Sequence, residues 1–188
     1  MDVISQLETI LPKVSEVAGS VRPDQFDNPT PCTSFVVRDL FDHMIGGASQ
    51  FAPQLRGEDA AAPGEMADLD DADRHAALRA ALVDLLDAAK SPGALGRTVQ
   101  LPFGAVAGEV LARFLTVDGM VHTWDIATAT GQQYTPDERL VSAVLATAHD
   151  LIAPAMRDGE TFAAETSVPE AAPAIARLAA FTGRTVAA

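Results

Sequence analysis

The chain contains a single cysteine, Cys32, so it cannot form an intrachain disulfide. The same scarcity excludes a zinc site built from several cysteines. Basic residues are also few, because 13 Lys and Arg stand against 26 Asp and Glu, for a formal net charge of -13. Binding to nucleic acid or to an anionic membrane would need a basic stripe, so we expect neither partner.

Aromatic residues make up only 5% of the chain, although 48% of it is hydrophobic. Abundant alanine with few aromatic side chains favours closely packed helices over a β-sandwich. The first eight residues lack the basic and apolar regions of a signal peptide, and no apolar run is long enough to span a bilayer. We therefore expect a cytoplasmic, helical protein.

Apolar residues recur at helical spacing in four long segments. Pro12 predicts a kink or break in the first of them, and Thr33 or Ser34 is a suitable N-cap for the second. Gly131 is placed to end the fourth. The predicted long helices span residues 2–19, 34–55, 71–90 and 106–130.

The remaining segments complete an all-α prediction. Residues 97–104 are β-prone but contain Pro102, which limits them to an extended segment or hairpin edge. A further helix is expected to start near Thr135 and run to about Met156, and a short C-terminal one to cover 172–181. Loops are expected at 20–33, 56–70 and 157–170. The whole chain, 1–188, is predicted to form one antiparallel four-helix bundle.

Two histidines and a carboxylate are the candidate metal ligands. Asp118 and His122 are four residues apart on one predicted helix, so their side chains lie on one face, a turn apart. His43, on another predicted helix, is a candidate third ligand. From the residues alone, a lone histidine such as His43 on an apolar helix face is more often a hydrogen-bonded core residue than a ligand, and Asp118 and His122 are also interpretable as a simple helical polar pair.

Three further residues near these ligands have open roles. Asp125 is placed either to orient a ligand histidine or to anchor its helix end. Asp39 is a candidate second partner for His43 or a partner of the helix dipole. Cys32 either lines the mouth of the site or is a small buried cysteine.

Three blocks of the sequence resemble the DinB/YfiT-like metal-binding bundles related to the N-terminal domain of mycothiol-dependent maleylpyruvate isomerase. The first is Thr30-Pro31-Cys32-Thr33, followed by Val37-Arg38-Asp39-Leu40 and His43. The second is Leu101-Pro102-Phe103-Gly104, followed by Asp118, His122-Thr123-Trp124-Asp125-Ile126-Ala127 and Ala129-Thr130-Gly131. The third is Arg177-Leu178-Ala179-Ala180-Phe181-Thr182-Gly183-Arg184.

The resemblance implies a four-helix bundle with a divalent metal near one end, held at the positions of His43, Asp118 and His122. The isomerase relatives usually carry glutamate where this chain has Asp118. They also carry a further C-terminal domain, for which 188 residues leave insufficient room, so isomerase activity itself is not implied. The family's chemistry implies that the metal activates a low-molecular-weight thiol such as mycothiol.

Two imidazoles and a carboxylate form a mixed ligand set that zinc accepts best, with nickel, manganese or iron as alternatives. Three protein ligands leave open positions, which is typical of a catalytic site. The functional hypothesis is a metal-dependent and thiol-dependent transferase or isomerase acting on a small molecule. The alternatives are a non-catalytic metal- or ligand-binding module and a purely structural domain. Pairing through helix faces would give a homodimer.

Overall fold

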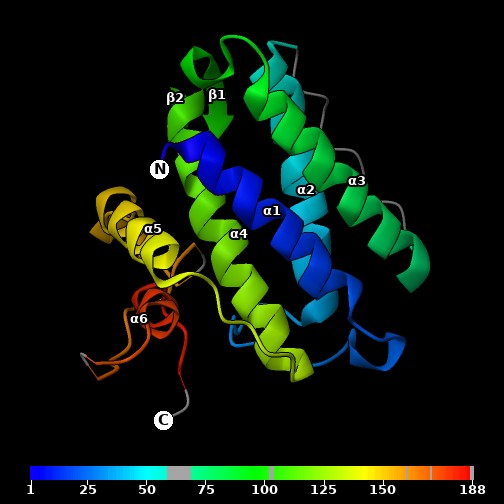
Figure 1. Cartoon of the computed structure of the whole chain (residues 1–188), viewed down its shortest axis with the longest axis vertical. Helices are drawn as coiled ribbons and strands as arrows, with labels where there is room; N and C mark the ends of the chain where they lie inside the picture. Colours follow the sequence, from blue (N-terminus) through cyan, green and yellow to red (C-terminus); the bar gives the residue numbers. More distant parts are fainter. Residues whose placement is uncertain (59–68, 102–103, 160, 170, 187–188) are drawn as a thin grey trace.

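A computed structural model of the chain describes residues 1–58, 69–101, 104–159, 161–169 and 171–186 (Figure 1). The described part is predominantly helical, with one small antiparallel hairpin formed by β1 (Thr98–Leu101) and β2 (Gly104–Ala107). The all-α prediction is confirmed. The helices are α1 (Val3–Gly19), α2 (Val37–Arg56), α3 (Asp71–Lys90), α4 (Gly108–Thr130), α5 (Glu138–Leu151) and α6 (Ala174–Phe181).

The four long helices run as two parallel pairs that are antiparallel to each other (Figure 1). Arg38 near the start of α2 pairs with Asp71 at the start of α3, so these two helices share a direction. Lys90 at the end of α3 pairs with Glu8 near the start of α1, which therefore runs the opposite way. α4 lies beside α1 and follows its direction (Figure 1). The chain consequently crosses the length of the bundle between α2 and α3.

The contact between α1 and α4 is close because a glycine faces it. A Cβ atom added to Gly119 would lie 3.1 Å from Ile10 Cγ2, and the neighbouring side chains of Leu11 and Val14 lie only slightly farther away. Glycine therefore lets the two helix backbones approach, and this places the functional residues of α4 next to the core of the bundle.

Several predicted boundaries need correction. Neither Thr33 nor Ser34 caps α2, which begins at Val37, and Asp39 Oδ2 instead accepts a 2.9 Å hydrogen bond from the Val36 N–H. Asp39 thus stabilises the helix start, as an acidic residue in a first turn does. α1 continues through Pro12 without a break.

Differences also appear later in the chain. The predicted start of α4 is replaced by β2, because residues 104–107 pair with β1 before the helix begins at Gly108. α5 ends at Leu151, and a short 3-10 turn, Pro154–Met156, follows. The predicted loop at 56–70 falls mainly on residues 59–68, which lie outside the described residues, as do Pro102 and Phe103.

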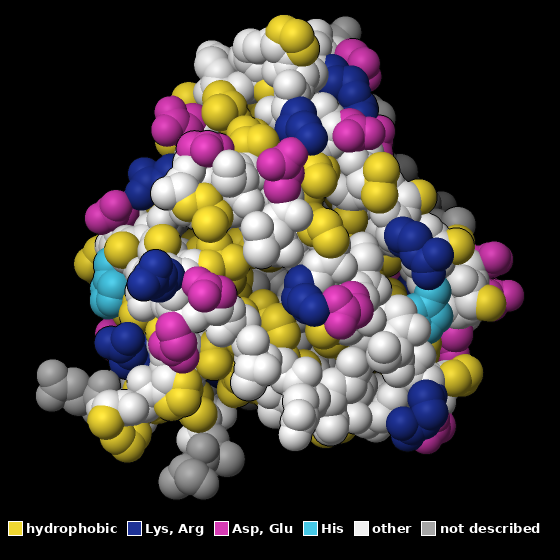
Figure 2. Space-filling view, in the orientation of Figure 1, with side chains coloured by type: hydrophobic (Ala, Val, Ile, Leu, Met, Phe, Trp, Pro, Cys, Tyr) yellow, Lys and Arg dark blue, Asp and Glu magenta, His cyan; other side chains and the backbone are white. Residues whose placement is uncertain are grey.

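α5 and α6 pack against each other and against α4, on the side away from α3 (Figure 1). This arrangement brings the C-terminal segment against the residues of α4 that carry the site. On the face drawn in Figure 2, the described basic side chains lie singly among acidic ones. In the described ranges, no helix is both long enough and apolar enough to cross a membrane.

Candidate metal centre

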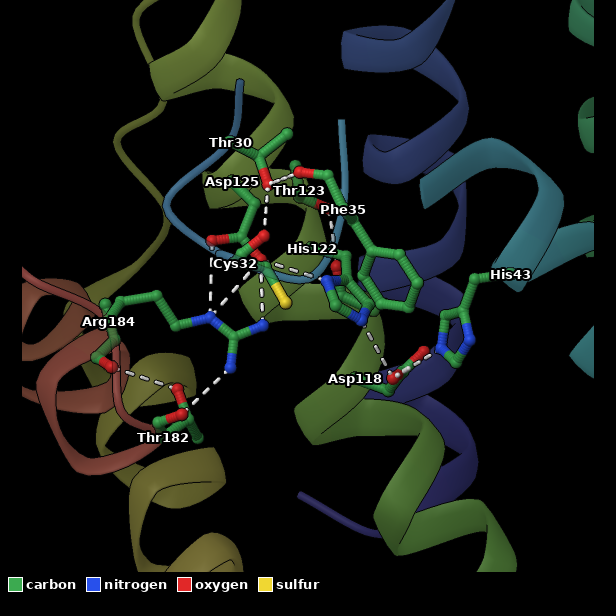
Figure 3. Close-up of polar contacts among 12 residues, drawn as sticks. Thr30, Cys32, Phe35, His43, Asp118, His122, Thr123, Asp125, Thr182 and Arg184 are labelled. Carbon is green, nitrogen blue, oxygen red and sulfur yellow. Dashed lines mark hydrogen bonds and ion pairs between the residues drawn. The ribbon is translucent and has the colours of Figure 1, made fainter. Parts of the chain in front are cut away.

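The structure brings His43, Asp118 and His122 together between α2 and α4 (Figure 3). Asp118 Oδ1 lies 3.3 Å from His43 Nε2 and 3.2 Å from His122 Nε2, so one carboxylate oxygen is shared by the two imidazoles. His122 is buried, with 7% of its side chain exposed, whereas 42% of the His43 side chain is exposed. The cluster therefore sits at the edge of the core, accessible from one side.

The spacing of these atoms fits a metal ion. Donor atoms that share a tetrahedral ion at about 2.1 Å are separated from each other by about 3.4 Å. Both distances between Asp118 and the histidines are close to this value, and the three ligand atoms all lie within 4.8 Å of one another. Asp118 reaches both imidazoles although its side chain is one methylene shorter than glutamate. The donor set is nitrogen and oxygen, which suits zinc and its neighbours in the first transition row.

Behind His122 lies a fully buried acid. Asp125 Oδ2 is 2.9 Å from His122 Nδ1, and this contact directs the other ring nitrogen, Nε2, toward Asp118. Of the two roles left open for Asp125, the structure supports the first, since the carboxylate contacts a candidate ligand histidine. A carboxylate on the remote nitrogen of a metal-binding histidine fixes the orientation and tautomer of the ring.

The Asp125 carboxylate has a second partner from the far end of the chain. Arg184 donates from Nη2 to Asp125 Oδ2 over 2.9 Å and from Nε to both carboxylate oxygens over 3.3 Å. Its Nη1 donates to the Thr182 carbonyl oxygen. The result is a buried line of contacts that runs from the segment after α6 to the cluster of candidate metal ligands (Figure 3).

The contacts of Asp118, His122 and Asp125 determine the ionisation of these three side chains. Burial disfavours a charged His122, but the Asp118 and Asp125 carboxylates outweigh burial and raise the pKa of His122 to about 9. Burial likewise opposes ionisation of Asp118, yet the two histidines lower its pKa well below the usual range. The pKa of Asp125 is lowered because His122 and Arg184 together overcome its burial. Without a metal, His122 is thus an imidazolium held between two carboxylates.

The loop before α2 covers the cluster. Its Phe35 ring lies 5.5 Å from the His43 ring and 6.3 Å from the His122 ring, measured between centroids. Thr30 fixes this loop by donating to the carbonyl oxygens of Cys32 and Phe35. Cys32 is half-buried and lines the same cavity as the three candidate ligands. Burial raises the pKa of its thiol, which therefore stays protonated at neutral pH.

Comparison with known proteins places the sequence of this chain in a family. Residues 7–127 match the family described as mycothiol maleylpyruvate isomerase N-terminal domain. The chain belongs to this family. The match includes all three candidate ligands and Asp125, whereas Arg184 lies beyond it.

The curated relatives of this family member carry no functional description in their names. Uncharacterized protein MT0763 and Uncharacterized protein Rv0738, from two strains of Mycobacterium tuberculosis, are each 38% identical to it over 169 residues. The alignment covers 89% of this chain and 90% of each relative. No solved structure shows a significant match.

Sequence reasoning found the residues of the cluster but missed two parts of its surroundings. The partnership of Arg184 with Asp125 joins positions 59 residues apart, and local periodicity carries no information about it. Its place in the third family-like block was the one available indication. Phe35 was not singled out either, because a lone aromatic residue in a loop has no pattern around it.

Proposed function

We propose that this protein binds a divalent metal ion through His43, Asp118 and His122 and uses it to present a thiol to a small electrophile. The observation that carries the proposal is the Asp118 oxygen shared between two imidazole Nε2 atoms, beside a cavity. Membership of a family whose description names mycothiol supports a low-molecular-weight thiol of that type. The reaction class that follows is a transferase or an isomerase.

Zinc is the ion that this ligand set favours, and nickel, manganese or iron are compatible with it. When bound, such an ion stabilises a thiolate at neutral pH, which is the nucleophilic form of a thiol. Three protein ligands would leave positions for the thiol.

The chain's own residues prepare the site for this chemistry. Asp125 accepts a hydrogen bond from His122 Nδ1, which leaves Nε2 directed at the ligand position. Arg184 balances the charge of the buried Asp125 carboxylate. Phe35 lies beside both imidazoles and forms an apolar neighbour for them on one side.

Metal content tests the first half of the proposal. Elemental mass spectrometry should find near-stoichiometric metal in the untagged wild type and background metal in His122→Ala. His149→Ala is the matched control, because His149 is exposed on α5 and stacks on Phe181. No metal in the wild type after incubation with zinc, nickel and manganese would overturn the proposal.

Thiol binding tests the second half. Cobalt-substituted protein should change its visible and near-ultraviolet absorption when mycothiol is added, as thiolate coordination to the ion produces a charge-transfer band. An unchanged spectrum at millimolar mycothiol would leave a metal-binding protein without the proposed thiol chemistry.

A further inference from the structure

A cavity of about 330 Å³ opens beside the metal-ligand cluster and extends into the bundle. His43, Asp118 and His122 form one part of its wall. Its wall also includes Leu11 of α1 and Leu82 of α3, which are core residues with no more than 4% of their surface exposed. The cavity therefore reaches the hydrophobic core and has the candidate metal position in its wall.

The lining disfavours an anionic occupant. Among the described residues that line the cavity, Arg184 is paired with the buried Asp125, and His122 is held between Asp118 and Asp125. Asp118 places a carboxylate at the cluster end, and the chain as a whole carries a net charge of -13. A carboxylate or phosphate group in the apolar part, away from the candidate metal position, would thus be desolvated with no unpaired cationic side chain of the described lining to balance it.

We propose that the cavity binds an uncharged alkyl or aromatic group and that it is the subsite for the electrophile. Cavities with apolar walls accept apolar molecules, and about 150 Å³ is enough for benzene. The larger volume here therefore suits a group of roughly 8 to 12 carbon atoms. The inference that such a group binds depends on the cavity alone. The inference that the group is the electrophile rests on the proposed function.

A glycine in the wall gives direct access to this subsite. Gly47 follows His43 by one turn of α2, so it lies on the same face of the helix. A Cβ atom added to Gly47 would meet a single heavy atom within 4 Å, Phe51 Cε2 at 3.8 Å, so the backbone there borders open space. A leucine at this position would project into the cavity without a clash and would also favour the helix.

Isothermal titration of the metal-loaded protein with 1-octanol tests the inference. We expect 1-octanol to bind the wild type, and Gly47→Leu to weaken that binding at least about tenfold by filling the cavity. Ser49→Leu, at an exposed position of the same helix, is the matched control and should bind like the wild type. Maleate, a small dicarboxylate, should not compete with 1-octanol.

Three results would overturn the inference: no binding of 1-octanol to the wild type, equal binding to Gly47→Leu, or maleate binding that Gly47→Leu removes. If Gly47→Leu does not fold, Leu115→Trp adds bulk from the half-buried wall of α4 and carries the same expectation.

The mycothiol titration of cobalt-substituted protein separates the two proposals. Binding of 1-octanol without a response to mycothiol would support the apolar subsite and contradict the proposed thiol function. A response to mycothiol without 1-octanol binding would support the proposed thiol function and contradict the apolar subsite.

Discussion

The guanidinium of Arg184 and the imidazole of His122 meet on the same oxygen atom. Asp125 Oδ2 lies 2.9 Å from Arg184 Nη2 and 2.9 Å from His122 Nδ1. Asp125 is fully buried, and less than a tenth of the Arg184 and His122 side chains is exposed. The segment after α6, which lies outside the family match, is therefore bound to the residue that orients a candidate metal ligand.

Removing Arg184 should destabilise the fold strongly. Arg184→Met leaves the buried Asp125 carboxylate without its guanidinium partner and with only His122 beside it, and loss of one partner of a buried pair costs about 3–5 kcal/mol. Urea denaturation measures this change. Arg113→Met is the control, because the ion pair of Arg113 with Asp150 lies at the surface and contributes less than about 1 kcal/mol. Equal unfolding midpoints for the two variants would contradict the buried role of Arg184.

Neutralising Asp125 should weaken metal binding by the folded protein, in addition to the stability lost with its Arg184 pair. Asp125→Asn preserves the shape of the side chain but removes the charge that orients His122, and changes of this kind reduce metal affinity by about 10- to 100-fold. Competition with a chromophoric chelator gives the affinity. Asp39→Asn provides the comparison, since Asp39 lies one turn before His43 and contacts the Val36 N–H, so its metal affinity should match the wild type.

The two candidate ligands on α4 show what could be predicted from the sequence. Asp118 and His122 lie a turn apart on α4, and a spacing of four residues on a helix is sufficient to place both on one face. The same argument placed His43 on a helix, although only the family-like blocks around it indicated that α2 would bring it to α4. The spacing of residues along the sequence therefore predicts which side chains share a helix face, but it does not predict which helices pack together.

Other features were outside the reach of the sequence because they depend on tertiary packing. The helix α2 was predicted to begin after a cap at Thr33 or Ser34, but it begins at Val37. Pro29 and Val36 form a β-bridge that keeps the preceding loop extended. The cavity beside the cluster is a void between helices, and voids leave no pattern along the chain. The feature of the sequence that relates to this cavity is Gly47, a small residue one helical turn after His43.

The junction between the hairpin and α4 should not tolerate a side chain. A Cβ atom added to Gly108 would lie 2.2 Å from the Ala94 carbonyl oxygen, a backbone atom that cannot move aside cheaply. Gly108→Ala should therefore lower the free energy of unfolding by about 1–3 kcal/mol. Gly19→Ala is matched to it, since nothing lies within 4 Å of an added Cβ there, and it should leave stability within about 1 kcal/mol of the wild type. Two variants of equal stability would contradict the close contact at Gly108.

The stability of the metal-free protein should fall at alkaline pH because of His122. Its pKa in the folded protein is about 9, above the ordinary value of 6.5, so the folded state holds this proton more tightly than the unfolded state. The resulting stabilisation is fully present below about pH 6.5 and is lost as the pH rises through about 9, with a total of about 3 kcal/mol. Urea denaturation between pH 6 and 10 measures it. His122→Gln should lack this dependence, and an identical pH profile in wild type and variant would refute the assignment.

The same proton should oppose metal binding. A metal ion at His122 Nε2 has to displace the proton that Asp118 stabilises there, so binding releases about one proton at pH 7. Affinity for zinc should consequently rise by up to about tenfold for each pH unit between pH 7 and 9, and more slowly above pH 9. Titrations in two buffers of different ionisation enthalpy count the released protons. A zinc affinity that is independent of pH across this range would show that His122 does not exchange its proton for the metal.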